Sequence, residues 1–292
     1  MYIGRFAPSP TGSLHFGSLV TAVGSYLHAR QQDGRWLVRI EDLDTPRIIK
    51  GADKAILSVL HRFGMDWDGD IMYQSQRQLA YQDALDTLIS LQLIYPCTCT
   101  RQRLKGKVYD AYCRQNTTIP NQPYALRVKV NTPTLQFSDN IQGDISQNML
   151  TEIGDFIVKR KDGLFAYQLA VVVDDAAQGV TDVVRGCDLL DTTTRQLYLQ
   201  QLLGFPQPNY THLPVMVNAD GLKLSKQNHA PTIDNQPILP LLYQALTMLG
   251  QSPPADLIHE NLQIFWDWAI KHCSIDNVPL QMNVIINTED MF

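Results

Sequence analysis

The chain has 292 residues, of which 45% are hydrophobic and 18% are charged, and its formal net charge is −5. This composition excludes an intrinsically disordered chain, and it allows a large core and about two domains. No apolar run approaches the roughly 20 residues that span a membrane, and the first residues lack the pattern of a signal peptide. We therefore expect a cytoplasmic globular protein without a membrane partner.

The chain begins with a predicted strand, turn and helix. Residues 2–6 are a short strand-like run that two prolines end, and apolar residues at helical spacing predict a helix over 17–30. Gly12 and Gly17 let the backbone lie close to a ligand, and the N–H groups at a helix N-terminus favour an anion. This pattern predicts a phosphate site, in which His15 could stabilise developing charge.

Residues 36–40 are an apolar strand that ends in the acidic residues Glu41 and Asp42. Side chains at the carboxyl end of a strand lie at the crevice where open α/β sheets bind ligands. Strand and helix patterns alternate through residues 1–95, which predicts the first half of a parallel, Rossmann-like sheet. We expect this α/β sheet to resume over residues 151–227.

Three of the five cysteines lie close together in the sequence, at Cys97, Cys99 and Cys113. In a cytosolic chain such a cluster holds a metal more often than a disulfide, and tetrahedral zinc takes four ligands. Spacing alone leaves the fourth position open between Tyr109, Tyr112 and water, and it also allows a cluster without metal. Basic side chains nearby are numerous enough to approach an RNA backbone: Arg101, Arg103, Lys105, Lys107 and Arg114.

The middle of the chain contains further predicted strands. The polar residues 131–147 have the pattern of strands joined by turns, and the apolar run within 165–175 predicts a buried strand. The segment 184–188 contains Arg185, whose guanidinium suits bidentate recognition of a carboxylate. We therefore expect a carboxylate-binding residue in the second half of the sheet.

A second motif follows an apolar strand and an Asx-Gly turn, and it reads Lys223-Leu224-Ser225-Lys226-Gln227. A mobile loop of this kind can close over a triphosphate, where Lys226 would neutralise phosphate charge.

Residues 228–292 have a net charge of −6 and leucines at helical spacing. They predict a small helical module, with its two tryptophans in the core, rather than an RNA-binding domain.

The segment from Arg5 to Ser18 and the lysine loop, in this order, resemble the two ATP signatures of class I aminoacyl-tRNA synthetases. The form Arg-Phe-Ala-Pro-Ser-Pro-Thr-Gly over residues 5–12 narrows the resemblance to the glutamyl branch. The loop departs from the family pattern at Leu224, where methionine is usual, and at Gln227, where serine is usual. The resemblance implies a class I α/β fold: a Rossmann-like parallel sheet with a zinc-bearing insertion and a small C-terminal helical module. It implies ATP with Mg²⁺ as a substrate, His15 and Lys226 as catalytic residues, and an ATP site of Pro8, His15, Gly17, Ser18, Lys223, Leu224, Ser225, Lys226 and Gln227.

Four further segments are similar to segments of glutamyl-tRNA synthetases: residues 36–45, 165–175, 184–188 and 191–196, the last without the family's proline. The family binds the substrate's amino group with the glutamate of the first segment, here Glu41, and the second segment offers Tyr167. Arg5 and Arg185 could hold the two carboxylates of glutamate and reject the neutral amide of glutamine, and the sequence does not say which arginine holds which. The implied glutamate site is Arg5, Ala7, Ser9, Glu41, Tyr167 and Arg185.

Glutamyl-type enzymes often carry a zinc element of the form Cys-x-Cys…Tyr-x-x-x-Cys at this place, inside an insertion that binds the acceptor end of tRNA. The resemblance implies one structural zinc ion, held by Cys97, Cys99, Tyr109 and Cys113, which stabilises a segment with little core of its own. We expect four segments: the first half of the catalytic domain at 1–95, the insertion at 96–150, the second half with the lysine loop at 151–227, and the helical module at 228–292, without an anticodon-binding domain.

The chain ends about 65 residues after the lysine loop, whereas glutamyl-tRNA synthetases continue with helical domains that read the anticodon. In this it resembles a truncated branch, the glutamyl-Q tRNA(Asp) synthetases. That branch forms glutamyl-adenylate from L-glutamate and ATP without tRNA, and it transfers the glutamyl group to the queuosine base in the anticodon of tRNA(Asp). The resemblance implies this ligase activity, with L-glutamate, ATP and queuosine-bearing tRNA(Asp) as partners, and we expect a monomer.

Two alternatives stay open. A minimal glutamyl-tRNA synthetase that charges the acceptor end would share every motif through Lys226. A non-catalytic regulatory paralogue is the other, and the intact His15, Glu41, Arg185 and Lys226 argue against it.

Overall fold

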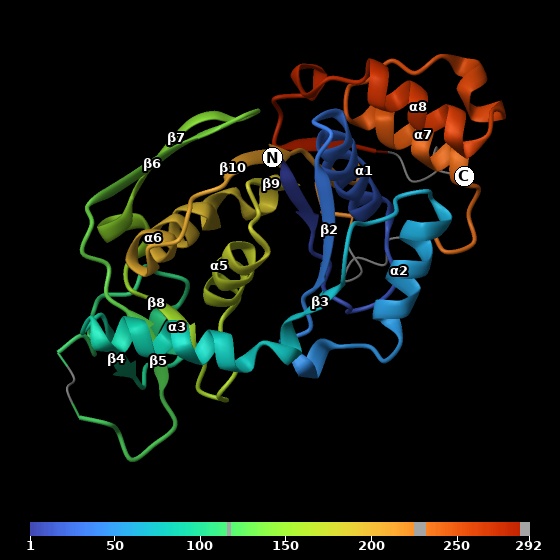
Figure 1. Ribbon diagram of the computed structural model, residues 1–292. Helices are drawn as coiled ribbons and strands as arrows, with labels where there is room; N and C mark the ends of the chain where they lie inside the picture. The colour runs from blue at the N-terminus through green and yellow to red at the C-terminus, as the bar shows by residue number, and fades with distance from the viewer. Residues whose placement is uncertain (116–117, 225–231, 287–292) are drawn as a thin grey trace.

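Three parallel strands form the N-terminal half of the fold (Figure 1). The computed structural model describes residues 1–115, 118–224 and 232–286. Strand β1 (Ile3–Phe6) pairs in parallel with β2 (Arg35–Ile40), and β2 pairs in parallel with β3 (Met72–Tyr73). The last five residues of β2 are buried, as expected for a strand that is covered on both faces. The predicted parallel first half of the sheet is confirmed.

Helix α1 (Phe16–Gln31) connects β1 to β2 and confirms the helix predicted there. It is buried over most of its length because β1, β2 and β9 lie on one side of it and the C-terminal helices on the other. The remaining helices of this half are α2 (Ala52–Arg62) and α3 (Gln78–Ser90). Burial of α1 fixes the position of its N-terminus, which is where the first motif lies.

A second set of strands continues the fold beyond β1, in the order β7-β6-β10-β9. Strands β9 (Asp182–Gly186), β10 (Asn209–Leu213) and β6 (Thr134–Asp139) are parallel neighbours, and β7 (Gly143–Asn148) forms an antiparallel hairpin with β6. The hairpin confirms the strands predicted in the polar stretch. Just before β9, the Thr181 N–H donates to the Ile3 carbonyl oxygen at 2.9 Å and joins the two halves.

Residues 167–178 form a helix, α5 (Tyr167–Gln178), so the strand predicted over 165–175 is wrong. Seven consecutive residues from Leu169 to Asp175 are buried. A helix that is buried all round has no polar stripe, and its sequence is then not distinguishable from that of a buried strand. Gly179 ends the helix with a positive φ of 65°. Helix α6 (Thr193–Leu203) packs against it.

A small antiparallel sheet of β4 (Ile94–Cys97), β5 (Ala125–Val128) and β8 (Phe156–Lys159) lies in and beside the expected insertion. One short helix, α4 (Arg101–Leu104), and the π-helical turn η3 (Met149–Ile153) lie in the same region. The buried residues around the cysteines form a separate, small cluster: Tyr95, Cys97, Tyr109 and Cys113.

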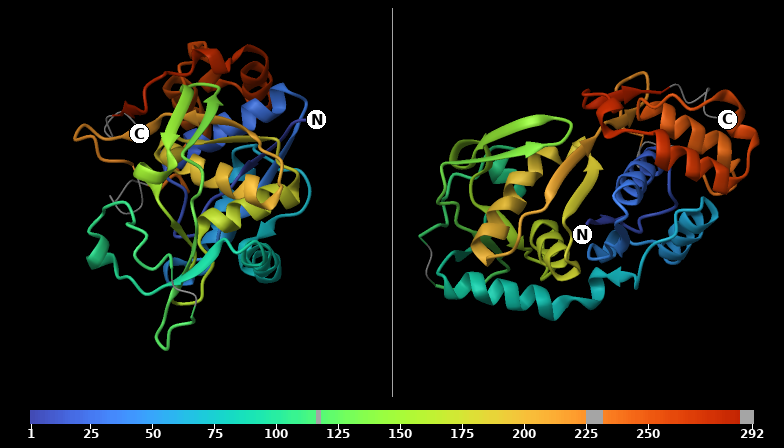
Figure 2. Two further views of the ribbon diagram at one scale, coloured as in Figure 1. Left: turned by 90° about the vertical axis from the view of Figure 1, so that its left-hand side faces the viewer. Right: turned by 45° about the horizontal axis from the view of Figure 1, so that its top comes forward.

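The C-terminal region places α7 (Ile238–Met248) and α8 (Leu262–His272) against α1 (Figure 2). It is not wholly helical, because β12 (Asn283–Ile285) pairs in parallel with β11 (Val215–Val217). Trp266 is buried and donates to the Phe63 carbonyl oxygen at 2.9 Å, whereas Trp268 is only partly buried. The expectation of a tryptophan core is therefore confirmed for Trp266. The domain boundaries at 95, 150 and 227 stay a prediction.

Short 3₁₀ helices complete the described chain: Thr45–Arg47, Gln74–Gln76, Cys187–Thr192, Ala255–His259 and Ile275–Asn277. Within the described ranges, the helices are all too short or too polar to cross a membrane.

Candidate active site

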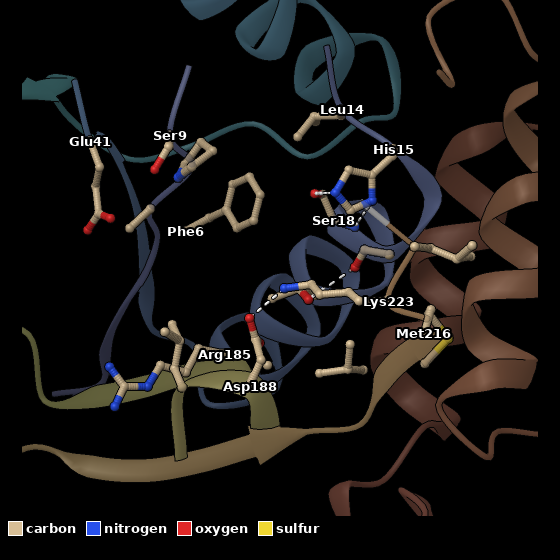
Figure 3. A pocket seen from close by; sticks show the side chains of 18 of the residues that line it. Phe6, Ser9, Leu14, His15, Ser18, Glu41, Arg185, Asp188, Met216 and Lys223 are labelled. Atoms are coloured by element: carbon tan, nitrogen blue, oxygen red, sulfur yellow. Dashed lines mark hydrogen bonds and ion pairs between the residues drawn. The ribbon is translucent and has the colours of Figure 1, made fainter. Parts of the chain in front are cut away.

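A cavity of about 550 Å³ lies between β1, the start of α1, and the ends of β9 and β11, a size typical of small-molecule sites. The predicted glutamate-binding and ATP-binding residues that the structure describes all line it: Arg5, Ala7, Pro8, Ser9, His15, Gly17, Ser18, Glu41, Tyr167, Arg185, Lys223 and Leu224. Figure 3 shows Glu41 and Arg185 at one side and His15, Ser18 and Lys223 at the other. The predicted Ser225, Lys226 and Gln227 lie outside the described residues.

The phosphate side of the cavity is built by the N-terminus of α1. His15 caps this helix: its Nδ1 accepts from the Ser18 N–H at 3.3 Å, and its Nε2 lies 3.0 Å from the Ser18 hydroxyl. A side chain on Gly17 would lie 3.3 Å from the His15 ring and 3.4 Å from the Leu224 carbonyl oxygen. Glycine therefore lets the loop of the second motif approach the helix end, where N–H groups favour an anion.

Lys223 and Asp188 form an ion pair at the same side of the cavity. Asp188 lies in the short helix after β9, and Lys223 lies in the loop after β11. The pair connects the two segments at the wall of the cavity. A phosphate group could compete with Asp188 for the Lys223 ammonium group, which is partly exposed.

The opposite side of the cavity contains a network of buried charges. Asp175 accepts from Arg5 Nε at 3.1 Å and from Arg39 Nη1 at 2.7 Å. Burial alone would raise the pKa of Asp175, but Arg39 and Arg5 hold that pKa below its ordinary value. Asp175 therefore stays ionised, and its single negative charge offsets part of the positive charge of the two arginines.

Glu41 is the carboxylate of this network that can still bind a ligand. Arg39 Nη2 lies 3.5 Å from Glu41 Oε1, and no described residue forms a hydrogen bond with that oxygen. Burial raises the pKa of Glu41 to about 7, although Arg39 and Arg5 oppose the shift. An incoming ammonium group would lower this pKa and would satisfy Oε1. Burial likewise raises the pKa of Tyr167, so its phenol stays a hydrogen-bond donor.

Arg185, unlike Arg5, is buried among uncharged hydrogen-bond acceptors. Its Nε donates to His212 Nε2 at 3.0 Å, its Nη1 to Gln196 Oε1 at 2.7 Å and its Nη2 to Thr193 Oγ1 at 2.8 Å. These three acceptors are uncharged, and in the described part of the chain Arg185 has no ion pair. A buried charge without a countercharge is unfavourable. Of the two predicted arginines, Arg185 is therefore the one that needs a carboxylate from a ligand.

Several residues of the site were not predicted. Thr21, Asp188 and Met216 line the cavity, and Asp175 and His212 hold the arginines from behind. Asp175 and Asp188 lie within the segments 165–175 and 184–188, in which Tyr167 and Arg185 were the predicted site residues. His212 gives no such signal, because it is a single histidine in a short strand that carries no predicted motif.

The cysteines meet in the insertion, away from the cavity. The ligand atoms of Cys97, Cys99 and Cys113 all lie within 4.8 Å of one another, and the Cys99 and Cys113 sulfurs are 3.6 Å apart. Two thiolates on one tetrahedral zinc are about 3.8 Å apart, given Zn–S bonds of about 2.3 Å. The Tyr109 hydroxyl lies 3.6 Å from the Cys97 sulfur. Three sulfurs and one phenol oxygen thus fit a zinc ion, whereas Tyr112 is largely exposed.

The chain is similar to known proteins. The family model for the catalytic domain of class I tRNA synthetases (E and Q) matches residues 3–239. The chain belongs to this family. Proteins named glutamyl-Q tRNA(Asp) synthetase are similar over nearly the whole chain: that of Aromatoleum aromaticum is 50% identical over 96% of this chain and 91% of its own length. That of Pseudomonas entomophila is 49% identical over 97% of this chain and 96% of its own length.

The fold of this chain is similar to that of a solved structure. A glutamate-tRNA synthetase from Elizabethkingia anophelis superposes with a TM-score of 0.83 at 24% identity, over 99% of this chain and 69% of that one. The predicted fold class and the predicted resemblance to the glutamyl branch are confirmed. As a member of the family, the chain is an enzyme of the ligase type. The roles of individual site residues stay predictions.

Proposed function

We propose that this synthetase activates L-glutamate with ATP and transfers the glutamyl group to the queuosine base in the anticodon of tRNA(Asp). One observation carries the choice of amino acid: Arg185 is buried, has only uncharged acceptors among the described residues, and faces the same cavity as Glu41. An amino acid with an ammonium group and a carboxylate side chain satisfies both residues at once. Glutamine would leave the Arg185 charge unmatched.

The orientation of glutamate follows from the two sides of the cavity. Its α-carboxylate must face the phosphate side, because that group attacks the α-phosphate of ATP. Its ammonium group then lies at Glu41 and Tyr167, and its side-chain carboxylate lies at Arg185. Ala7 and Ser9 lie on the turn after β1, where Pro8 accepts from the Glu41 N–H at 3.0 Å.

The activation step forms an acyl–phosphate bond and releases pyrophosphate. The α1 N-terminus, His15 and Lys223 would stabilise negative charge on the phosphates, and we assign Lys226 the same task from the sequence. Mg²⁺ enters with ATP as part of the substrate. No protein nucleophile is needed, because orientation and electrostatic stabilisation are sufficient for this chemistry.

The acceptor is assigned from the relatives. The proteins that share about half of their residues with this chain over most of their length carry the name glutamyl-Q tRNA(Asp) synthetase. In the second step, a hydroxyl of the cyclopentene ring of queuosine would displace AMP from glutamyl-adenylate. We name no general base for this step. We place the enzyme in the cytoplasm as a monomer.

Cys97, Cys99, Tyr109 and Cys113 would hold one zinc ion. When bound, the ion cross-links a segment that has a small core and gives it a fixed shape. The basic side chains around this segment could then approach an RNA backbone. We assign zinc no part in the activation step, because the cysteines do not line the cavity.

Transfer of radiolabelled glutamate tests the proposal. The purified enzyme is incubated with ATP and three RNAs: tRNA(Asp) with queuosine, tRNA(Asp) without it, and tRNA(Glu). We expect label only on the first. Label on tRNA(Glu) would instead support a minimal synthetase that charges the acceptor end, and absence of glutamate-dependent pyrophosphate exchange would support a non-catalytic protein.

A further inference from the structure

A chain of hydrogen bonds leads from Arg185 away from the cavity. Arg185 Nε donates to His212 Nε2 at 3.0 Å, and His212 Nδ1 lies 2.6 Å from Asp139 Oδ2. The three residues come from the adjacent strands β9, β10 and β6, and all three are buried. Arg185 lines the cavity, whereas His212 and Asp139 lie behind it.

The proton positions in this chain follow from Asp139. Its Oδ1 accepts from the backbone N–H groups of Ile141 at 3.0 Å, Gln142 at 2.9 Å and His212 at 3.2 Å, so Oδ2 is the oxygen that faces the His212 ring. An ionised carboxylate only accepts, so His212 Nδ1 carries a proton. Burial holds the pKa of His212 below its ordinary value, against the influence of Asp139, and the ring is neutral. Its Nε2 therefore has a lone pair for Arg185.

We propose that Asp139 and His212 are positioning residues that hold Arg185 for the side-chain carboxylate of L-glutamate while leaving its positive charge unmatched. This assignment rests on the proposed function. It explains why an imidazole stands where a carboxylate would bind a guanidinium more strongly. A carboxylate against Arg185 would offset its charge, as Asp175 does in part for Arg5, and the site would then accept a neutral amide. The imidazole orients Arg185 and keeps the negative charge of Asp139 one ring away.

The decisive variant is Asp139→Asn. Oδ1 faces three backbone N–H groups, so the new amide must keep its oxygen there and turn its NH₂ group toward His212 Nδ1. His212 then carries its proton on Nε2 and no longer accepts from Arg185. We expect the KM for glutamate in pyrophosphate exchange to rise about 30-fold, the effect of losing a buried hydrogen bond to a charged group. The KM for ATP should stay unchanged, and the preference for glutamate over glutamine should fall.

Two variants of His212 separate positioning from simple structural support. His212→Gln can present an amide oxygen to Arg185 and should keep the KM for glutamate closer to that of the wild type. His212→Leu removes the acceptor, while Asp139 still accepts from the backbone N–H groups of the turn that follows it. This variant should raise the KM for glutamate as Asp139→Asn does. A matched control is Asp66→Asn, because Asp66 forms the same 2.6 Å contact with Nδ1 of His61 on the exposed surface. It should leave both KM values unchanged.

Nitrogen-15 NMR of the ligand-free protein gives a readout that does not depend on activity. We expect His212 to carry its proton on Nδ1 in the wild type and on Nε2 in Asp139→Asn. A shifted tautomer with an unchanged KM for glutamate, or equal KM values for His212→Gln and His212→Leu, would overturn the proposal. Wild-type enzyme with the expected tautomer but without glutamate-dependent exchange would instead overturn the proposed function, and with it the substrate assigned to Arg185.

Discussion

The cavity and the cysteine cluster hold their polar groups by different means. Around the cavity, Asp175 accepts from two arginines and Arg185 donates to three uncharged groups, and large buried cores lie on both sides. Around the cysteines the buried core is four residues. The fold therefore arranges the cavity before any ligand binds, whereas the insertion is expected to depend on a bound metal.

The largest effect should come from Arg185, because the fold supplies it with orientation but not with a countercharge. Arg185→Met should lower kcat/KM for glutamate in pyrophosphate exchange about 1,000-fold, which corresponds to losing a buried ion pair with the substrate, about 3–5 kcal/mol. The residual activity should no longer prefer glutamate to glutamine. Arg30→Met is the control, since Arg30 pairs with Asp68 outside the cavity. If Arg185→Met still preferred glutamate to glutamine as strongly as the wild type does, the assignment of Arg185 to the substrate's side-chain carboxylate would be wrong.

Loss of metal should affect the insertion and leave the cavity intact. Cys113→Ser should lower zinc affinity by more than the roughly 10–100-fold typical of losing a supporting residue, as measured by competition with a chromogenic chelator. Hydrogen exchange should become faster in residues 97–113 and stay unchanged in β1, α1 and β9. Cys273→Ser is the control, because Cys273 lies far from the cluster in the sequence and belongs to a different packing region. Equal acceleration in both regions would mean that the cavity also depends on the metal.

Some of these features could be predicted from the sequence and others could not. The strand at Ile3–Phe6 and the helix after His15 were predictable, because prolines, glycines and a periodic apolar pattern mark their ends locally. Helix α5 was not, because burial on all sides removes the helical pattern from Leu169 to Asp175. The cavity residues lie in recognisable motifs at strand ends, but the contact between His212 and Asp139 joins positions 73 residues apart. Only tertiary structure brings such a pair together.

The Glu41 carboxylate should make glutamate binding depend on pH. Burial raises its pKa to about 7, so Glu41 is protonated below that pH and then cannot attract the substrate's ammonium group. The KM for glutamate should therefore fall as the pH rises through 7, and it should be about tenfold higher at pH 6 than at high pH, as expected for one titrating group. Glu41→Gln should have a high KM without this pH dependence. A wild-type KM that is constant from pH 6 to pH 8 would show that Glu41 stays ionised.

An effect no larger than this should come from Arg127, which supports the cysteine cluster from one side. Its Nε donates to the Cys97 sulfur at 3.2 Å, and its guanidinium lies 3.9 Å from the centre of the Tyr109 ring. These contacts orient both side chains and favour negative charge on them, so Arg127→Met should lower zinc affinity about tenfold. Arg103→Met is a matched control.

Arg103 also lies over a tyrosine of the insertion, Tyr112, at 4.3 Å, but it pairs with Asp110 on the exposed surface. Its loss should leave zinc affinity unchanged, because neither contact reaches a zinc ligand directly. Arg127→Lys should fall between the wild type and Arg127→Met, since lysine keeps the charge and loses the planar contact with the ring. If the two methionine variants lowered zinc affinity equally, the general positive charge of the insertion, and not the contacts of Arg127, would be what stabilises the metal site.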